Sequence, residues 1–313
     1  MSLPKPWSSM LRPWAWRACT LPGGRRLGQG IYGLGLAALA RARRTPGWPV
    51  VSEHQVGCAN LPARMARAHY FGKLSFLETD VLFANPPRPS VLARWRAEAP
   101  DDAGFAMIAP QIITHPQHGK GAQHHGGSRV VLTAAEVGQT GHLRATDVVR
   151  RAVDSLIEAA AALRATAVVF RTPPTFTPSS TNREVLRTFF AEIAAADRFG
   201  AVARIWEPQG LWDPHTAAVL AAELGVIFAG DPLASDPVAA PPELWASLPT
   251  DGVYFRLSGL GHARRSFPEL ELESLAETVV RYRRAWVVFS NVDAFADARR
   301  FAAMLDVADA TIE

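Results

Sequence analysis

The feature that most constrains this chain is an alternation, repeated eight times after residue 51, between a short apolar run and a longer helical pattern. Most of the short runs are apolar almost throughout, as expected for strands that are covered on both faces. They occupy residues 55–59, 76–83, 104–109, 167–171, 201–206, 226–229, 253–257 and 286–290. Such an alternation is typical of a parallel α/β fold.

Eight cycles without a strong interdomain linker favour a closed barrel over an open doubly wound sheet. The open sheet of a dinucleotide-binding enzyme is also disfavoured, because residues 56–60 lack the glycine-rich fingerprint that follows the first strand of such folds. We therefore predict that residues 51–313 form a single (β/α)₈ barrel of the TIM type. Residues 1–50 are predicted to be a poorly ordered extension of it.

The intervening segments carry helix signals. Thr181 and Glu184 have the spacing of a capping box, and Asp213-Pro214 is a typical pair for an N-cap and a first helical position. Within residues 149–163, apolar side chains recur at helical spacing on one face. We expect these stripes to pack on the barrel.

The first fifty residues differ in charge from the rest of the chain. They contain eight basic residues and no acidic one, which leaves 25 basic against 29 acidic residues and a net charge of about −4 for the remainder. The overall charge of +4 therefore gives no strong nucleic-acid signal for the barrel. A twin-arginine export signal at Arg25-Arg26, a tail that touches a membrane surface and a start codon placed too far upstream are alternative interpretations of this segment.

Two further features bear on the compartment. The chain has only two cysteines, Cys19 and Cys58, which is no disulfide framework and predicts a reducing, cytoplasmic location. The longest weakly apolar stretch of the first fifty residues, 27–40, is glycine-rich and too short to span a bilayer, so no transmembrane segment is predicted there. The sequence does not indicate an oligomeric state.

Polar residues cluster at or just after the ends of the predicted strands, where the active sites of such barrels lie. The second run contains carboxylates within an apolar strand, which is unfavourable unless they are paired or functional. Along the chain the polar set comprises Glu78, Asp80, His115, Arg171, Glu207, Asp231, Arg256 and Asn291.

Two chemical roles are open for this set. Glu78, His115, Glu207 and Asp231 are the candidate catalytic residues, either as ligands of a divalent metal or as general acids and bases without one. The candidate substrate-binding residues are Arg171, Arg256, Asn291 and Asp80. The arginines would clamp an anionic group of a small-molecule ligand, or instead form ion pairs that keep buried acids charged.

A second group of histidines follows the third predicted strand. His115, His118, His124 and His125 lie in a glycine-rich loop, and histidines at such density can bind a transition metal. The glycines make a preformed site entropically unfavourable, so apart from His115 we interpret this group as a solvated loop.

Eight short motifs, in this order along the chain, resemble those of the family known as domain of unknown function 72, or YecE-like. The resemblance runs from about residue 54 to 305 and rests on Val56-Gly57-Cys58, Leu77-Glu78-Thr79-Asp80, Trp95, Ala109-Pro110-Gln111-Ile112-Ile113-Thr114-His115, Pro173-Pro174-Thr175-Phe176, Glu207-Pro208-Gln209 with Trp212, Tyr254-Phe255-Arg256-Leu257-Ser258-Gly259 and Phe289-Ser290-Asn291.

The resemblance implies a TIM-type barrel without an established activity. The chain departs from the family pattern at Asp80, where the family usually has Asn. It also departs at Ile108, Gln111, Gln209 and Ser258, most of which remove a positive charge or a proton carrier. The sequence thus predicts a divergent member, either an enzyme that uses strand-end carboxylates on a small polar substrate or a non-catalytic ligand-binding barrel descended from such an enzyme.

Overall fold

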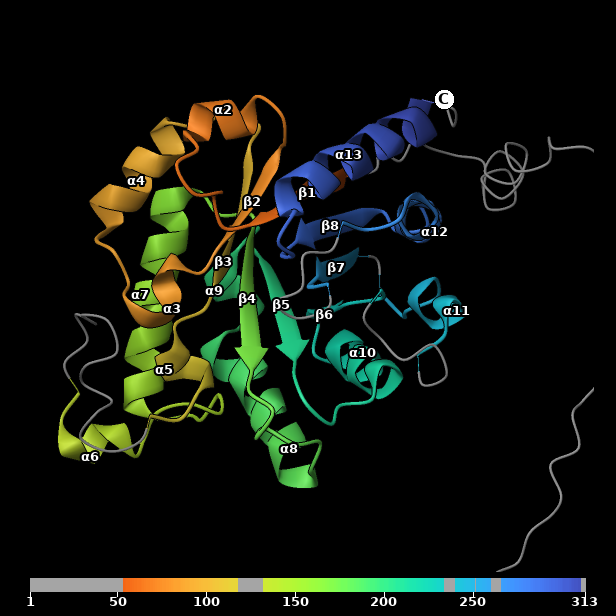
Figure 1. Cartoon of the computed structure of the whole chain (residues 1–313). Helices are drawn as coiled ribbons and strands as arrows, with labels where there is room; N and C mark the ends of the chain where they lie inside the picture. Colours follow the sequence, from red (N-terminus) through yellow and green to blue (C-terminus); the bar gives the residue numbers. More distant parts are fainter. Residues whose placement is uncertain (1–52, 118–131, 234–239, 251, 260–265, 311–313) are drawn as a thin grey trace, which may run out of the picture. The chain divides into compact units, whose positions relative to one another are not determined.

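The computed structural model describes residues 53–117, 132–233, 240–250, 252–259 and 266–310. Eight parallel strands pair in chain order and close on themselves, β1 beside β8, to form a barrel (Figure 1). The strands are β1 (Glu53–Ala59), β2 (Phe76–Thr79), β3 (Gly104–Ile108), β4 (Ala167–Thr172), β5 (Ala203–Pro208), β6 (Ile227–Gly230), β7 (Gly252–Leu257) and β8 (Arg284–Phe289). The predicted (β/α)₈ barrel is therefore confirmed.

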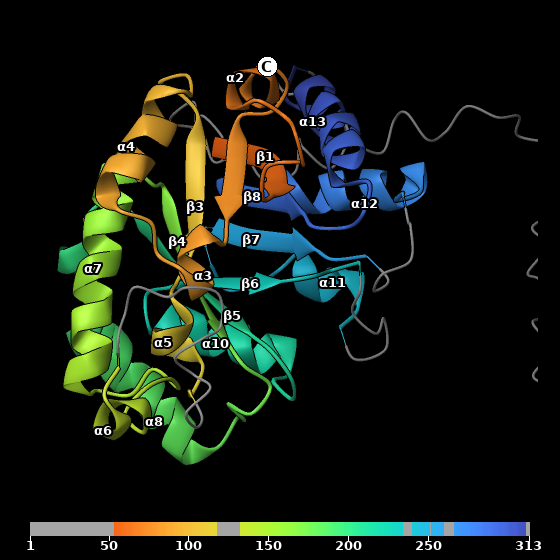
Figure 2. The ribbon, with the colours of Figure 1, turned by 60° about the vertical axis from the view of Figure 1, so that its left-hand side comes forward.

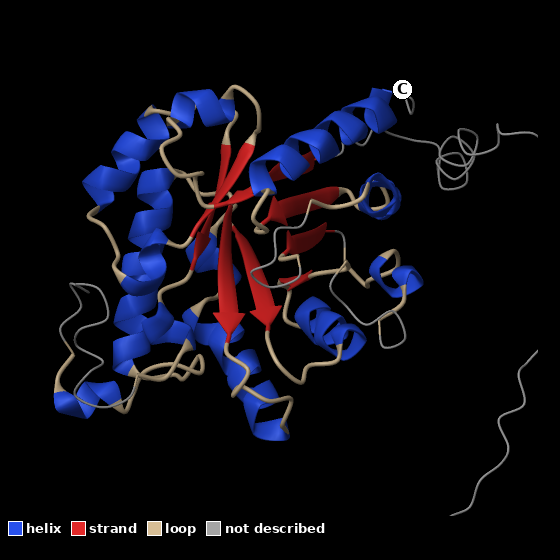
Figure 3. Cartoon of the chain, in the orientation of Figure 1, coloured by secondary structure: helices blue, strands red, loops and turns tan. Residues whose placement is uncertain are grey.

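Helices lie around the outside of the strands (Figures 2 and 3). They are α2 (Arg67–Phe71), α3 (Val81–Ala84), α4 (Pro89–Ala97), α5 (Gln111–Thr114), α6 (Ala134–Val137), α7 (Asp147–Leu163), α8 (Ser180–Thr188), the π-helix η3 (Phe189–Ile193), α9 (Ala196–Phe199), α10 (Pro214–Glu223), α11 (Pro242–Trp245), α12 (Glu269–Val279) and α13 (Ala294–Ala310). No helix of the described part is long and apolar enough to cross a membrane.

Some predictions fall on residues that the structure does not describe. The extension 1–50 with its alternative interpretations, Cys19, and His118, His124 and His125 all lie outside the described ranges.

Two apolar clusters make up the core. The larger one lies between the strands and the helices, and includes the predicted stripe of α7. The smaller one fills the inside of the barrel with Phe76, Ala106, Ile108, Ala167, Val169, Ile205, Ile227, Ala229, Tyr254, Trp286 and Val288. Because side chains alternate between the two faces of a strand, residues two positions beyond these inner residues also point inward.

Close approach of the first two strands requires a glycine. A Cβ added at Gly57 would lie 1.8 Å from the backbone oxygen of Phe76. The Tyr70 hydroxyl spans the same joint, donating to Phe76 O at 2.7 Å and accepting from Cys58 N at 2.8 Å. Cys58 is 1 % exposed, as its place in a predicted buried strand suggested.

The second strand is shorter than predicted. It ends at Thr79, and residues 81–84 form helix α3 instead of continuing the strand. Asp80 has a φ of −99° and a ψ of 9°, so the backbone turns there, and Asn60 Oδ1 accepts its N–H at 3.1 Å. The prediction that Asp80 lies inside a strand was wrong, since apolar residues on a strand and on a short following helix give the same continuous run.

The helix caps match the sequence in part. Asp213 caps α10 by accepting from Thr216 N at 2.8 Å, with Pro214 in the first turn, as predicted. Helix α8 is instead capped by Ser179, which accepts from Asn182 N at 3.1 Å, so the prediction of Thr181 as the cap was wrong. A Ser two residues earlier serves equally well as a cap, and the spacing alone does not choose between them.

Candidate functional site

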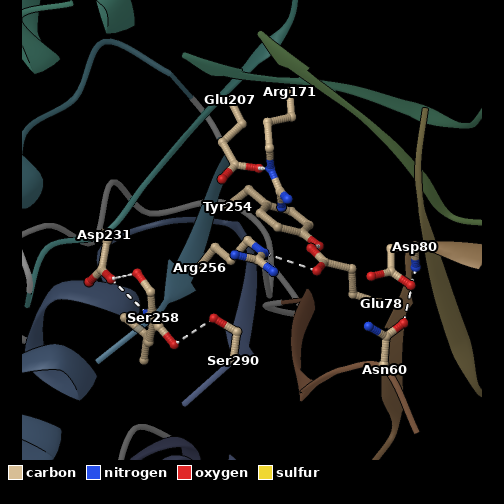
Figure 4. Close-up of polar contacts among 11 residues, drawn as sticks. Asn60, Glu78, Asp80, Arg171, Glu207, Asp231, Tyr254, Arg256, Ser258 and Ser290 are labelled. Atoms are coloured by element: carbon tan, nitrogen blue, oxygen red, sulfur yellow. Dashed lines mark hydrogen bonds and ion pairs between the residues drawn. The ribbon is translucent and has the colours of Figure 1, made fainter. Parts of the chain in front are cut away.

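A layer of charged side chains closes the carboxyl end of the barrel interior. On four strands, an inner apolar residue is followed two positions later by a charged one: Phe76 by Glu78, Val169 by Arg171, Ile205 by Glu207 and Tyr254 by Arg256. Strand alternation therefore turns all four charged side chains into the barrel. Figure 4 shows them gathered around Tyr254.

Glu78 is held by two residues of strand β7, which is separated from β2 by β1 and β8. Its Oε2 accepts from the Tyr254 hydroxyl at 2.7 Å, and its Oε1 accepts from Arg256 Nε at 3.0 Å (Figure 4). Glu78 is 1 % exposed and Tyr254 is fully buried. A carboxylate this deeply buried is tolerated because both of its oxygens have donors and one of them is a cation.

The protonation states of the two donors follow from their surroundings. Burial and the neighbouring negative charge of Glu78 raise the pKa of Tyr254, so its hydroxyl stays neutral and donates. Burial alone lowers the pKa of Arg256, but the charges of Glu78 and Glu207 outweigh it and raise the pKa overall. Arg256 is therefore a permanent cation beside a carboxylate.

Arg171 and Glu207 form a second ion pair in the same layer. They stand opposite one another in the register of β4 and β5, and Arg171 Nε donates to Glu207 Oε2 at 2.8 Å. The two side chains are 18 % and 13 % exposed. Because Glu207 also raises the pKa of Arg256, the two pairs are electrostatically connected.

His115 lies on the β3–β4 side of this layer. A hydrogen bond of 2.8 Å joins its Nδ1 to Thr114 Oγ1, and the ring of Phe83 packs edge-on against it at 5.1 Å. Burial lowers the pKa of His115 to about 4, and electrostatic interactions with Arg171 and His142 add to this effect. The imidazole is therefore neutral at physiological pH and is able to accept a proton or a hydrogen bond.

Asp231 is engaged with the loop after β7. Its Oδ2 accepts from both the backbone N–H and the hydroxyl of Ser258 at 2.7 Å, and its Oδ1 accepts from Leu233 N at 3.1 Å. In Figure 4 this group lies to one side of Glu78. These bonds join the loops after β6 and β7, and Ser258 is one of the positions at which the chain departs from the family pattern.

The last two predicted residues have other partners. Asn291 is buried, and its Nδ2 donates to Asp297 at 2.8 Å, at the start of α13. Asp80 is exposed; its backbone N–H donates to Asn60 Oδ1 (Figure 4), and its carbonyl accepts from Phe83 N at 2.8 Å. A substrate-binding role for these two residues stays a prediction.

The candidate metal ligands do not converge. Among the described residues, no three His, Cys, Asp or Glu side chains are arranged to hold a metal ion. Glu78 is bound by Arg256, Glu207 by Arg171 and Asp231 by Ser258, so each acid has a separate partner. Among the described residues these acids form no common set of ligands for a divalent cation, and their acid–base role stays a prediction.

Sequence reasoning missed Tyr254 and His142. Tyr254 precedes Arg256 by two positions, so strand alternation alone would have placed it on the same inner face. His142 lies in a segment of three consecutive residues with positive φ, 141–143. No sequence pattern indicates such a segment.

Two hollows lie away from the charged layer. One, of about 310 Å³, is at the amino end of β1–β3 and is lined by His54, Lys73 and Asp102 among others. The other, of about 500 Å³, lies outside the barrel between α4 and α7, and is lined largely by prolines and apolar residues such as Leu156. Because the carboxyl ends of the strands carry the chemistry in barrels of this class, neither hollow replaces the charged layer as the candidate site.

Comparison with known proteins shows the family and the fold. Residues 47–312 match the family described as "Protein of unknown function DUF72". No curated protein sequence matches the chain. Among solved structures, a DUF72 family protein from Enterococcus faecalis V583 is 16 % identical, with a TM-score of 0.57 and coverage of 82 % of this chain and 98 % of that one.

Two further structures have the same barrel. A DUF72 family protein from Thermotoga maritima MSB8 is 17 % identical, with a TM-score of 0.54 over 81 % of this chain and 99 % of that one. An L-ribulose 3-epimerase is 10 % identical, with a TM-score of 0.53 over 83 % and 95 %. At these identities the structures establish the fold alone. With the match over most of its length, the chain belongs to the DUF72 family of proteins of unknown function.

Proposed function

We propose that the chain is an enzyme that carries out acid–base chemistry on a small polar molecule at the carboxyl end of the barrel. The observation that supports this most is Glu78, a carboxylate that is 1 % exposed and lies inside the barrel. Burial of a charge is unfavourable, and such groups concentrate where function requires them.

The arrangement suggests a role for each of Glu78, Arg256 and Tyr254. Glu78 is the general base, and takes a proton from a substrate O–H or C–H onto its carboxylate. Arg256 fixes the orientation of that carboxylate through Oε1 and supplies positive charge near a developing oxyanion. Tyr254, which stays neutral, donates to Oε2 and holds the carboxylate in place.

Glu207, His115 and Asp231 take secondary roles in this proposal. Glu207 balances Arg171, and His115, neutral at physiological pH, is the candidate for returning the proton. Asp231 orders the rim through Ser258. The cytoplasm, predicted from the cysteine content, is the proposed compartment, and a small molecule is the proposed partner.

A non-catalytic ligand-binding barrel is the alternative. It is supported by Ile108, an apolar residue that lies 1 % exposed inside the barrel where the family pattern usually has Lys. It is also supported by the Ser258–Asp231 bonds, which use the hydroxyl of Ser258 to fix a loop. Such a protein would bind its ligand without turning it over.

Replacement of Glu78 by Gln tests the proposal. The purified protein would be screened for ligands by thermal shift against a panel of sugars, sugar acids and sugar phosphates, and then for turnover of the ligands found. Glu78→Gln keeps the shape and removes the base, so we expect turnover to fall by about 10²–10⁴-fold. Glu98→Gln, at a 42 % exposed carboxylate that also pairs with an arginine, is the control and should turn over normally.

Two outcomes would count against this function. Unchanged turnover in Glu78→Gln would remove Glu78 as the base. Ligands that bind to the wild-type protein but are never converted would favour the binding barrel instead.

A further inference from the structure

Arg171 has a hydrogen-bonding group that the charged layer does not use. Its Nε donates to Glu207, whereas its Nη2 is buried and has no hydrogen-bond partner among the described residues. A guanidinium offers five N–H donors in a plane, and leaving one of them buried without an acceptor is unfavourable. A buried donor of this kind is what an incoming acceptor would satisfy.

Two histidines lie at the same end of the barrel as this arginine, and its positive charge acts on one of them, His115. The segment that carries His142 lies directly on the backbone of His115: His142 N donates to Thr114 O at 2.9 Å, and a Cβ at Gly141 would come within 2.3 Å of the His115 carbonyl carbon. Non-glycine residues adopt positive φ rarely, yet both His142 and Leu143 do so here. Backbone strain of this kind is found where a side chain must be held in a particular place.

The loop after β4 completes the surroundings. His142 Nε2 is 3.1 Å from Thr175 Oγ1, and its ring lies 5.6 Å from that of Phe176. Because Thr175 and Phe176 follow Arg171 closely in the chain, this loop brings His142 to the same end of the barrel as the arginine. Arg171 lies close enough to His115 for its positive charge to add to the effect of burial in lowering the pKa of the imidazole.

We propose that the substrate of this site carries a compact oxyanion, a carboxylate or a phosphate, which Arg171 binds through Nη2 with His115 and His142 beside it. This inference rests on the proposed function, since it names the class of substrate that the same layer takes. Arginine is suited to the task because its planar donors match the oxygens of such groups. Arg171 and Glu78 both lie beside Tyr254 (Figure 4), so an anchored oxyanion would place the rest of the molecule toward Glu78.

The test measures binding of inorganic phosphate and of acetate to the full chain, which are the simplest phosphate and carboxylate probes. Imidazole resonances of His115, assigned by comparison with His115→Gln, would be followed by NMR at pH 7 as each probe is added. We expect a saturable shift of the His115 resonance and, at saturation, a raised pKa of His115, because the added negative charge favours its protonation. The probe that binds more tightly identifies the group on the substrate.

Three variants make the result specific. Glu207→Gln removes the negative charge that competes for Arg171, and should tighten binding. The double variant Arg171→Met with Glu207→Gln leaves no unpaired charge behind and should weaken binding about 10–100-fold, the worth of one or two charge-assisted hydrogen bonds. Arg67→Met, at an arginine that is also 18 % exposed and paired with a glutamate, is the matched control and should bind as the wild type does.

The inference is overturned if neither probe shifts His115, or if the double variant binds as well as the wild type. Its failure can be told apart from failure of the proposed function. Suppose that turnover depends on Glu78 but the substrates carry no anionic group. The oxyanion proposal is then wrong, and the proposal that the protein is an enzyme stands. Suppose instead that oxyanions bind through Arg171 but no ligand is converted. The oxyanion proposal then stands, and the proposed enzymatic function is wrong.

Discussion

At the scale of single residues, the charged layer is stable because each carboxylate is matched to its own donor. Two acids and two arginines from four strands alternate around Tyr254, so no charge in the group stands without an opposite one. His115 differs from them, because its neighbours are a cation and a second imidazole. It is therefore the residue whose titration should be visible in the stability of the protein.

Replacing His115 by Gln should reduce the loss of stability on mild acidification. With its pKa lowered to about 4, the folded-state imidazole stays neutral between pH 6.5 and 4, whereas in the unfolded chain it takes up a proton as the pH falls below about 6.5. Stability from this group is thus present above pH 6.5 and lost toward pH 4. Between pH 7 and 5 we expect a loss of about 1–2 kcal/mol in the wild type that is missing from the variant.

Urea unfolding at several pH values would measure this difference. His215→Gln, at an exposed histidine in the first turn of α10, serves as the control and should lose stability on acidification as the wild type does. Parallel pH profiles for His115→Gln and the wild type would contradict the prediction.

The positions of the charged residues were predictable from the sequence, but their pairing was not. Strand ends are visible as the ends of apolar runs, which is why Glu78, Arg171, Glu207 and Arg256 were singled out. That Glu78 meets Arg256 depends on how β2 and β7 face each other across the closed barrel, which no local pattern encodes. The position of His142 could not be predicted for the same reason, because it is set by a folded-back segment with positive φ.

At the scale of elements, the eight strands were predictable because a strand buried on both faces is apolar almost throughout. The boundaries of the strands were harder to predict than their existence. The second run divides into β2 and α3 because the chain turns at Asp80, and the helical pattern after Ser179 is interrupted by the π-helix η3. Freed carbonyls of the π-helix region accept from Arg204, at Phe190 and Ala194, so a tertiary contact satisfies the irregular backbone there.

Gly57→Ala should destabilise the barrel at the joint between β1 and β2. The added methyl group would lie 1.8 Å from Phe76 O, which is backbone and has no flexible end to move away. Either the β1–β2 hydrogen bonds or the Tyr70 bridge must give way, so we expect a loss of about 3 kcal/mol or more, at the upper end of single substitutions. Chemical denaturation of the purified variant measures it.

Gly138→Ala is the matched control for this substitution. Gly138 has a negative φ of −66° at the end of α6, and nothing lies within 4 Å of the position of an added Cβ. Its stability should change by less than about 1 kcal/mol. Equal effects of the two substitutions would show that close strand approach is not what requires glycine at position 57.

At the scale of the whole molecule, the number of strand–helix cycles was enough to predict the barrel. The division of the chain at residue 51 is a prediction from charge and composition. The proposed domain of residues 51–313 has 25 basic and 29 acidic residues, whereas the preceding fifty have eight basic residues and no acidic one. A boundary defined by charge has consequences for both stability and binding.

Removal of residues 1–50 should leave the barrel folded and reverse its net charge. If 51–313 is a self-sufficient domain, its free energy of unfolding in urea should match that of the full chain within about 0.5 kcal/mol. The charge should change from +4 to about −4, so any retention of the full chain on immobilised heparin or DNA at low salt should disappear on truncation. A lower stability would show that the first fifty residues pack on the barrel and that the domain begins earlier. Retention that survives truncation would place a polyanion-binding surface on the barrel itself, against the charge balance of its sequence.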